Sequence, residues 1–171
     1  MYNRDIADWE LAQRCIQIYC EKTQTFEEIT LFGGTPEISM LNYQTTSFGF
    51  VYEAKEYGDL WVYTEEAGAE QITAEDVAAF YVIGDQIYYI VNNAPNNSYE
   101  LRCFHWGKQV DSAVCELTDY SSMPYFIIEG DYLVFYAAHP MQNNQSIYKL
   151  DLRNPKQKEE SIFSVYQEYT L

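Results

Sequence analysis

The chain has 171 residues, of which 47% are apolar, so it is long enough to bury a core and too apolar for an intrinsically disordered chain. Its formal net charge is −16, and such an acidic surface disfavours nucleic-acid phosphates and anionic lipid. Aromatic residues are abundant, with 17 Tyr, 9 Phe and 3 Trp, and aromatic side chains favour β-strands. We therefore expect an all-β protein with no direct nucleic-acid binding and no membrane insertion.

The N-terminal segment, residues 5–21, fits two patterns of apolar residues. Its apolar side chains recur at helical spacing, but Ile16, Ile18 and Cys20 also alternate as in a β-strand. We favour a strand for 15–21 and leave 5–12 open to a helical turn.

Strand-like runs separated by turns predict a complete antiparallel unit over residues 36–73. A partial unit precedes it over 15–35, with a turn at 23–26 and a short strand at 28–32. The strands expected in the complete unit are 37–43, 47–53, 60–64 and 69–73.

A motif that occurs twice, 46 residues apart, predicts two further units. Each copy is an apolar run, a Gly-Asp turn and an aromatic run, over Phe80–Val91 and Tyr125–Tyr136. Gly supplies a positive φ at no steric cost, so Gly-Asp between two such runs is a hairpin signal. We expect four-stranded antiparallel meanders at 77–117 and 122–165, a tail at 166–171, and one domain over the whole of 1–171.

Short motifs resemble those of a known family. Residues 16–36 and 60–73 each contain a strand, an acidic turn and a short strand with the pair Ile-Thr. Residues 147–152 read Ile-Tyr-Lys-Leu-Asp-Leu. These stretches resemble the blades of TolB-like and divergent bacterial β-propellers, although Thr46-Ser-Phe-Gly49 replaces the Ser-Pro-Asp-Gly turn of the family. The resemblance covers about residues 15–165 and implies a small or partial β-propeller with a repeat period of about 40–46 residues.

The chain is short for a closed propeller, and an unclosed one leaves edge strands that invite pairing with another chain. We expect the tail, 164–171, to pair with strands in 5–31 and complete a fourth blade. If it does not, the chain is a homo-oligomer through its open β edges or a segment of a longer propeller.

The sequence offers no catalytic or metal-binding constellation. Cys103 and His105 share a strand face without a third orienting group, and His139 lies in a loop. Adjacent acid pairs point to opposite faces of a strand or lie in turns, where they make poor acid–base pairs. We expect a non-enzyme with no cofactor and no bound metal.

The four cysteines lack zinc or redox spacing and are expected to be mainly reduced: Cys15, Cys20, Cys103 and Cys115.

Aromatic and acidic residues near strand ends indicate a surface that binds a protein partner, which the chain's charge predicts to be basic. The candidate binding residues are Tyr57, Trp61, Tyr63, Glu65, Glu66, Glu70 and Trp106. The alternative is an acidic inhibitor, such as a toxin-immunity protein or a phage-encoded nucleic-acid mimic, because residues 21–100 alone carry a net charge of −12.

No apolar signal segment follows Met1, and no apolar window is long enough for a transmembrane helix. We expect a cytoplasmic protein if Met1 is the natural start, and an extracytoplasmic one if the chain is a segment of a longer protein.

Overall fold

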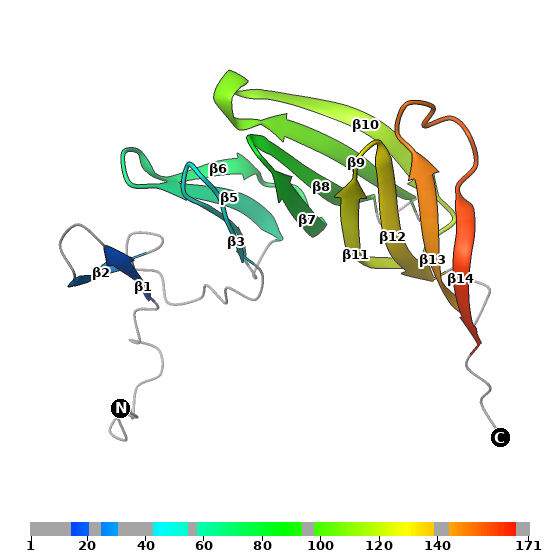
Figure 1. The fold of residues 1–171 in the computed structure, drawn as a ribbon, viewed down its shortest axis with the longest axis horizontal. Coiled ribbons are helices and arrows are strands. Elements are labelled where there is room, and N and C mark those ends of the chain that lie inside the picture. Colours follow the sequence, from blue (N-terminus) through cyan, green and yellow to red (C-terminus); the bar gives the residue numbers. More distant parts are fainter. Residues whose placement is uncertain are drawn as a thin grey trace.

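The computed structural model describes residues 15–20, 25–30, 43–54, 58–93, 98–138 and 144–166. Three four-stranded antiparallel sheets follow one another along the molecule, after a two-stranded hairpin (Figure 1). In each four-stranded sheet the strands are hydrogen-bonded in chain order, which is the predicted meander. The all-β fold class is confirmed, and no helix in the described part of the chain is long and apolar enough to cross a membrane.

The strands have the following bounds. The hairpin consists of β1 (Cys15–Cys20) and β2 (Thr25–Thr30). The first sheet contains β3 (Tyr43–Thr45), β4 (Phe50–Ala54), β5 (Asp59–Thr64) and β6 (Gly68–Thr73). The second contains β7 (Val77–Ile83), β8 (Gln86–Asn93), β9 (Ser98–His105) and β10 (Val110–Thr118), with the short 3-10 helix η3 (Trp106–Lys108) after β9. The third contains β11 (Ser122–Glu129), β12 (Tyr132–Ala138), β13 (Asn144–Asp151) and β14 (Glu160–Tyr166).

The repeated motif forms the same hairpin in the second and third sheets. Gly84 and Gly130 each stand first in a two-residue turn and have φ of +59°, as the type II′ turn requires. After each hairpin, the carbonyl of the turn aspartate accepts a backbone hydrogen bond of 2.8 Å. The donors are Trp106 N–H to Asp85 and Leu152 N–H to Asp131, which again lie 46 residues apart.

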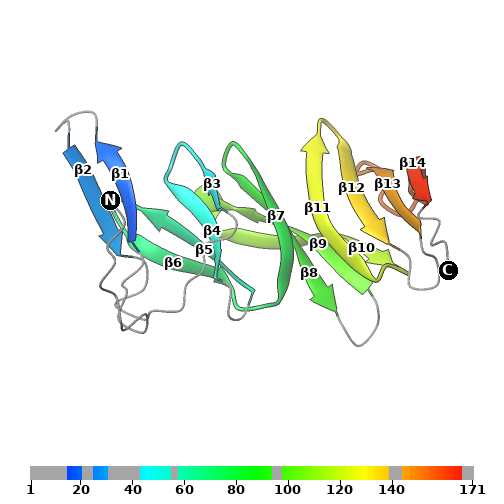
Figure 2. The ribbon, with the colours of Figure 1, turned by 90° about the horizontal axis from the view of Figure 1, so that it is seen from below.

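The three sheets stack face to face, as propeller blades do, and the second sheet lies between the other two (Figure 2). One of its faces packs against the first sheet through Val62, Ile87 and Tyr89, and the other packs against the third sheet. The second interface buries Ile90 and Leu133 fully. In addition, the Gln44 side chain joins β3 to β7, because its Oε1 accepts the Val82 N–H at 2.7 Å.

The predicted closure of a fourth blade by the tail is wrong within the described residues. Residues 164–166 continue β14, where Val165 pairs with Gln145 of β13, and β1 pairs with β2. The strand β14 therefore has its hydrogen-bonding partner inside the third sheet. Figure 1 places β1 and β14 at opposite ends of the molecule, so the stacked sheets form an open arc.

Other expected bounds change locally. The strand at 15–20 agrees with the strand alternative for 15–21, while 5–12 lies outside the described residues. The strand β2 begins at Thr25, inside the expected turn, and β4 begins at Phe50 because residues 46–49 form a tight turn. Of the strand expected at 37–43, the described part is Tyr43, where β3 begins.

Candidate functional site

A cleft lies where the turns at one end of the first sheet meet η3 of the second sheet. Its volume is about 780 Å³. We call it the aromatic–acidic cleft, and its lining residues are Thr45, Thr46, Ser47, Phe48, Gly49, Phe50, Tyr63, Thr64, Glu65, Glu66, Ala67 and Trp106.

The turn Thr46–Gly49 forms one side of the cleft and is held by three hydrogen bonds. The Thr46 N–H and hydroxyl both donate to the Gly49 carbonyl, at 2.8 and 3.0 Å, and the Phe48 N–H donates to Thr46 Oγ1 at 3.2 Å. Gly49 has φ of +150°, and a Cβ on it would lie 2.0 Å from the Tyr63 carbonyl oxygen. Only glycine lets this turn lie so close to β5.

Two aromatic stacks form the walls of the cleft. The Phe48 and Trp106 rings stack with centroids 5.3 Å apart and an interplanar angle of 15°, which joins the first sheet to the second. The Phe50 and Tyr63 rings stack at 5.1 Å and 24°. Trp106 also contacts Phe104 at 6.3 Å, so its position is fixed from two sides. Aromatic stacks of this kind form flat, rigid walls with little conformational entropy left to lose on binding.

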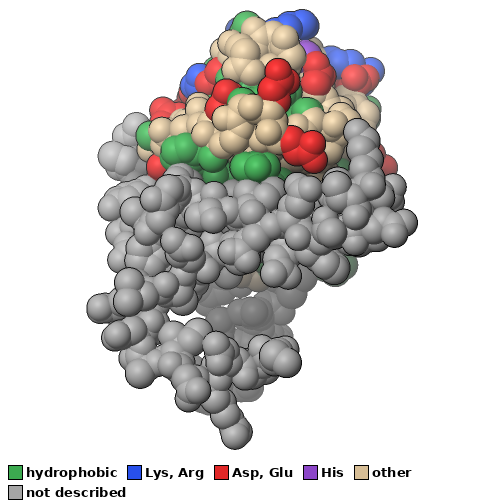
Figure 3. Space-filling model, turned by 90° about the vertical axis from the view of Figure 1, so that its left-hand side faces the viewer, with side chains coloured by type: hydrophobic (Ala, Val, Ile, Leu, Met, Phe, Trp, Pro, Cys, Tyr) green, Lys and Arg blue, Asp and Glu red, His purple; other side chains and the backbone are tan. Residues whose placement is uncertain are grey.

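Exposed carboxylates stand at the rim of the cleft. Glu65 and Glu66 occupy the β5–β6 turn, which the Ala67 N–H closes by donating to Thr64 Oγ1 at 3.0 Å. On the end of the molecule that faces away from the third sheet, acidic and hydrophobic side chains lie next to each other (Figure 3). The cleft therefore combines aromatic faces with negative charge, and this is the environment that a cation on an apolar stem prefers.

The structure brings together four of the seven predicted binding residues. Tyr63, Glu65, Glu66 and Trp106 line the aromatic–acidic cleft. Trp61 lies on the same face of β5 as Tyr63 but outside the lining. Glu70 pairs with Val62 across β5 and β6, so it belongs to the opposite face of the sheet, and Tyr57 lies outside the described residues.

Sequence reasoning missed Phe48 and Gly49 as parts of the site. It assigned residues 47–53 to one strand, in which Phe48 and Phe50 would share a face. The tetrapeptide Thr46-Ser-Phe-Gly49 was the available signal, since Thr before a glycine-containing turn can bond its own backbone.

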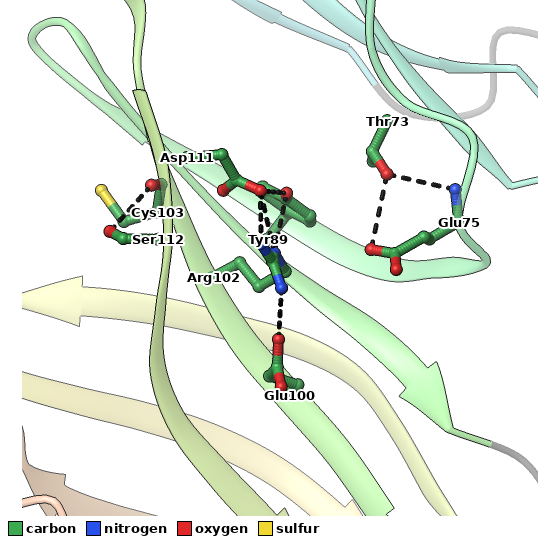
Figure 4. A network of polar contacts seen from close by, with 8 residues as sticks. All are labelled: Thr73, Glu75, Tyr89, Glu100, Arg102, Cys103, Asp111 and Ser112. Atoms are coloured by element: carbon green, nitrogen blue, oxygen red, sulfur yellow. Dashed lines mark hydrogen bonds and ion pairs between the residues drawn. The ribbon is translucent and has the colours of Figure 1, made fainter. Parts of the chain in front are cut away.

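A polar network on the second sheet joins Tyr89, Glu100, Arg102 and Asp111. The Arg102 guanidinium donates to Asp111 at 2.6 and 3.0 Å and to Glu100 at 2.6 Å, and Tyr89 donates to Asp111 at 2.9 Å (Figure 4). The bond to Asp111 is the main reason that the pKa of Arg102 is raised. These bonds link strands β8, β9 and β10, so the network stabilises the second sheet.

The two cysteines whose side chains are described are both free thiols. Cys103 is buried and Cys115 is half-buried, and burial raises the pKa of both thiols, to about 11 for Cys115. Neither thiol is therefore an activated nucleophile. The side chains of Cys15 and Cys20, and the whole of His139, lie outside the described residues.

His105 has polar neighbours on both ring nitrogens. Its Nδ1 lies 3.0 Å from Asp85 Oδ2, and its Nε2 lies 3.4 Å from Lys108 Nζ. Among the described residues, no group of three or more His, Cys, Asp or Glu side chains could hold a metal ion.

By its strand topology and its face-to-face stacking, the chain is an all-β protein built from propeller-type sheets. No family model matches the chain, and no curated protein matches it. Among solved structures it is similar to the N-terminal domain of Nup159, with a TM-score of 0.44 and 9% identity. The similarity covers 78% of this chain and 32% of that chain, so this chain spans about a third of its length. A likeness this distant assigns neither a family nor a partner.

Proposed function

We propose that this chain is a non-enzymatic protein-binding module whose aromatic–acidic cleft captures a basic segment of its partner. The single observation that carries the proposal is the meeting of two aromatic stacks and two exposed carboxylates around one cleft of about 780 Å³. Arginine and lysine side chains suit this combination, because their stems pack on aromatic rings while their charges meet carboxylates.

The chemistry of the lining supports binding over catalysis. None of the lining residues is a histidine, cysteine, lysine or arginine, so the cleft holds no Ser–His or Cys–His pair. Its two carboxylates are neighbours in one turn, whereas a general acid and a general base must lie on either side of the bond they act on.

The test compares two double charge reversals that change the net charge equally. The first is Glu65→Lys with Glu66→Lys, inside the cleft, and the second is Glu70→Lys with Glu75→Lys, at exposed positions outside the lining. The probe is a fluorescein-labelled peptide of alternating arginine and glycine, and fluorescence anisotropy at low salt reports its dissociation constant.

We expect the cleft variant to bind the peptide roughly 30-fold more weakly, because each reversal removes an ion pair of about 1 kcal/mol. The control variant should lose no more than about threefold through the altered net charge. Equal losses in both variants would refute recognition at the cleft and favour diffuse attraction by the acidic surface, as expected of an acidic inhibitor.

A second comparison tests the aromatic walls. Trp106→Ala removes one face of the Phe48 stack, while Tyr43→Ala removes an aromatic ring that is 59% exposed and lies outside the lining. Loss of peptide affinity in the first variant alone is the expected result, and unchanged affinity in both would contradict the role of the walls.

A further inference from the structure

One face of the third sheet is apolar and exposed. In register across β11, β12, β13 and β14, the side chains on this face are Tyr125, Tyr136, Ile147 and Phe163 in one row and Ile127, Val134, Lys149 and Glu160 in the next. Tyr125 is 72% exposed, Ile127 46% and Phe163 58%, whereas Val134, Tyr136 and Ile147 in the central strands are half-buried. We call the six apolar residues of these two rows the outer face of the third sheet. The alternate residues, such as Phe126 and Leu133, point the other way and are buried against the second sheet.

The repeat shows what covers such a face elsewhere in the same chain. The residues 46 positions before Tyr125, Tyr136 and Ile147 are Ala79, Ile90 and Leu101. These three are buried in the core that the second sheet shares with the third. Equivalent positions in the preceding unit are therefore covered by another four-stranded sheet.

The residues in the second row of the outer face also have counterparts that pack on the core 46 residues earlier in the chain. The counterpart of Ile127 is Tyr81, which packs on that core and contacts the Phe126 ring edge-on at 6.4 Å. The counterpart of Val134 is Tyr88, which is also packed against the core. By repeat equivalence, the outer face of the third sheet has the side-chain pattern of a sheet-packing surface.

We propose that the outer face of the third sheet binds the same face of a second copy of this chain, in a two-fold symmetric dimer. Two apolar sheet faces that pack against each other form a sandwich about 10 Å thick, which is a common arrangement of β-sheets. A two-fold interface needs only one self-complementary surface, and this face supplies its own apolar partner.

The distribution of charge favours this surface as the dimer interface and determines the direction of the symmetry axis. The chain carries a net charge of −16, so most of its surface repels a second copy. Beside the outer face the charges are instead balanced, because Lys149 is in register with Glu160, and the Lys149 Nζ lies 4.0 Å from the centre of the Tyr132 ring. Two acidic residues, Glu129 and Asp151, lie at one end of the face in register with Tyr132, and Asp151 also pairs with Arg153 at 2.6 Å. A two-fold axis perpendicular to the strands keeps the two acidic ends apart.

The size of the face sets the expected affinity. Four strands about 4.8 Å apart and about three residues at ~3.4 Å each give an apolar patch of roughly 19 by 10 Å. Even with side-chain relief, such a patch is smaller than a standard specific interface and suits a weak, transient dimer. We therefore expect a dimer that dissociates in the micromolar range rather than a permanent one.

The experiment measures the mass of the full chain by sedimentation or light scattering, at concentrations from about 1 to about 200 µM, which bracket micromolar dissociation. The wild type should rise from 20.0 kDa towards twice that mass. Ile127→Glu should stay at 20.0 kDa, because two buried carboxylates would face each other. The matched control is Val110→Glu, at a strand position that is 54% exposed and lies on the second sheet. It should dimerise as the wild type does.

Phe163→Glu is a second variant in case Ile127→Glu does not fold, because its side chain is more exposed. It should also remain monomeric. A wild type that stays monomeric at every concentration would overturn the proposal, and so would a dimer that survives both Glu substitutions. Peptide binding at the aromatic–acidic cleft should be unchanged in all three variants, so this proposal and the proposed function can fail separately.

Discussion

Replacing Gly49 by alanine should destabilise the protein more than the same replacement at a turn glycine where an added Cβ would have free space. The added Cβ would lie 2.0 Å from the Tyr63 carbonyl oxygen and 3.2 Å from the Thr64 Cα, both in the backbone of β5. A backbone atom cannot turn away as a flexible side chain can, so either β4 or β5 must move. The φ of +150° adds a conformational penalty that glycine avoids.

The expected loss of stability is the sum of the conformational cost of the positive φ and the steric cost of the contact with β5. A non-glycine residue held at positive φ costs about 1–2 kcal/mol, and forcing atoms into a closely packed contact costs about 1–3 kcal/mol. Gly49→Ala should therefore lower the free energy of unfolding by about 2–5 kcal/mol. With a urea m-value of about 2 kcal/mol per molar, the midpoint should fall by roughly 1–2.5 M.

The matched control is Gly84→Ala, in the β7–β8 turn. Its φ is also positive, +59°, but an added Cβ would have no heavy atom within 4 Å. This variant should lose only about 1–2 kcal/mol. Urea unfolding followed by far-ultraviolet circular dichroism measures both variants under one set of conditions. A cost for Gly49→Ala no greater than that for Gly84→Ala would refute the argument from close approach.

Three further predictions concern other parts of the chain. Tyr120→Phe should cost about 1–2 kcal/mol in urea unfolding, because the buried hydroxyl donates to Glu159 at 2.6 Å; an unchanged midpoint would show that this bond adds nothing. Alkylation of Cys115 at pH 8, resolved by peptide mass spectrometry, should be about 100-fold slower in the folded protein than in urea, because burial raises its pKa from 9.0 to about 11. Equal alkylation rates in the folded protein and in urea would contradict a raised pKa of the Cys115 thiol. The hydrogen bond from Arg153 lowers the pKa of Asp151 from 3.8 to about 2, so the pair stabilises the fold above pH 3.8 and stops doing so as the pH falls through about 2. Asp151→Asn should therefore lower the melting temperature clearly at pH 5 and much less at pH 2, and an equal difference at both pH values would disprove the linkage.

The strand order and the hairpins could be predicted from sequence because local chemistry determines them. Gly84 and Gly130 mark the turns between paired β-rich runs. Which face is buried could not be predicted for β12, because all of its residues are apolar or aromatic although their burial alternates along the strand. Closure of the arc could not be predicted in this way. Whether Val165 pairs with β13 or with a distant strand depends on long-range register, which the local pattern does not contain.

The candidate site was predictable in composition and not in geometry. Aromatic and acidic residues near turns are visible in the sequence, and Glu65 and Glu70 look alike there. The structure separates them, because Glu65 is in a turn beside the cleft while Glu70 pairs with Val62 on the opposite face of the sheet. The contact of Phe48 with Trp106 joins residues from two different sheets, so no spacing of residues along the sequence predicts it.

The repeat itself explains why function cannot be transferred from one unit to the next. Tyr89 and Arg102 in the second sheet correspond, 46 residues later, to Phe135 and Tyr148 in the third. The first pair is polar, and Arg102 donates to the Tyr89 hydroxyl at 3.2 Å. The second pair is an aromatic stack with centroids 5.3 Å apart inside the core. The first three strands pair in the same register in both units, while the last strand pair is shifted by two residues. The repeat therefore preserves most of the strand ladder, while the neighbour of each sheet decides which side chains its faces carry. A surface such as the aromatic–acidic cleft therefore depends on the particular side chains of the two units that meet there, and not on the repeat alone.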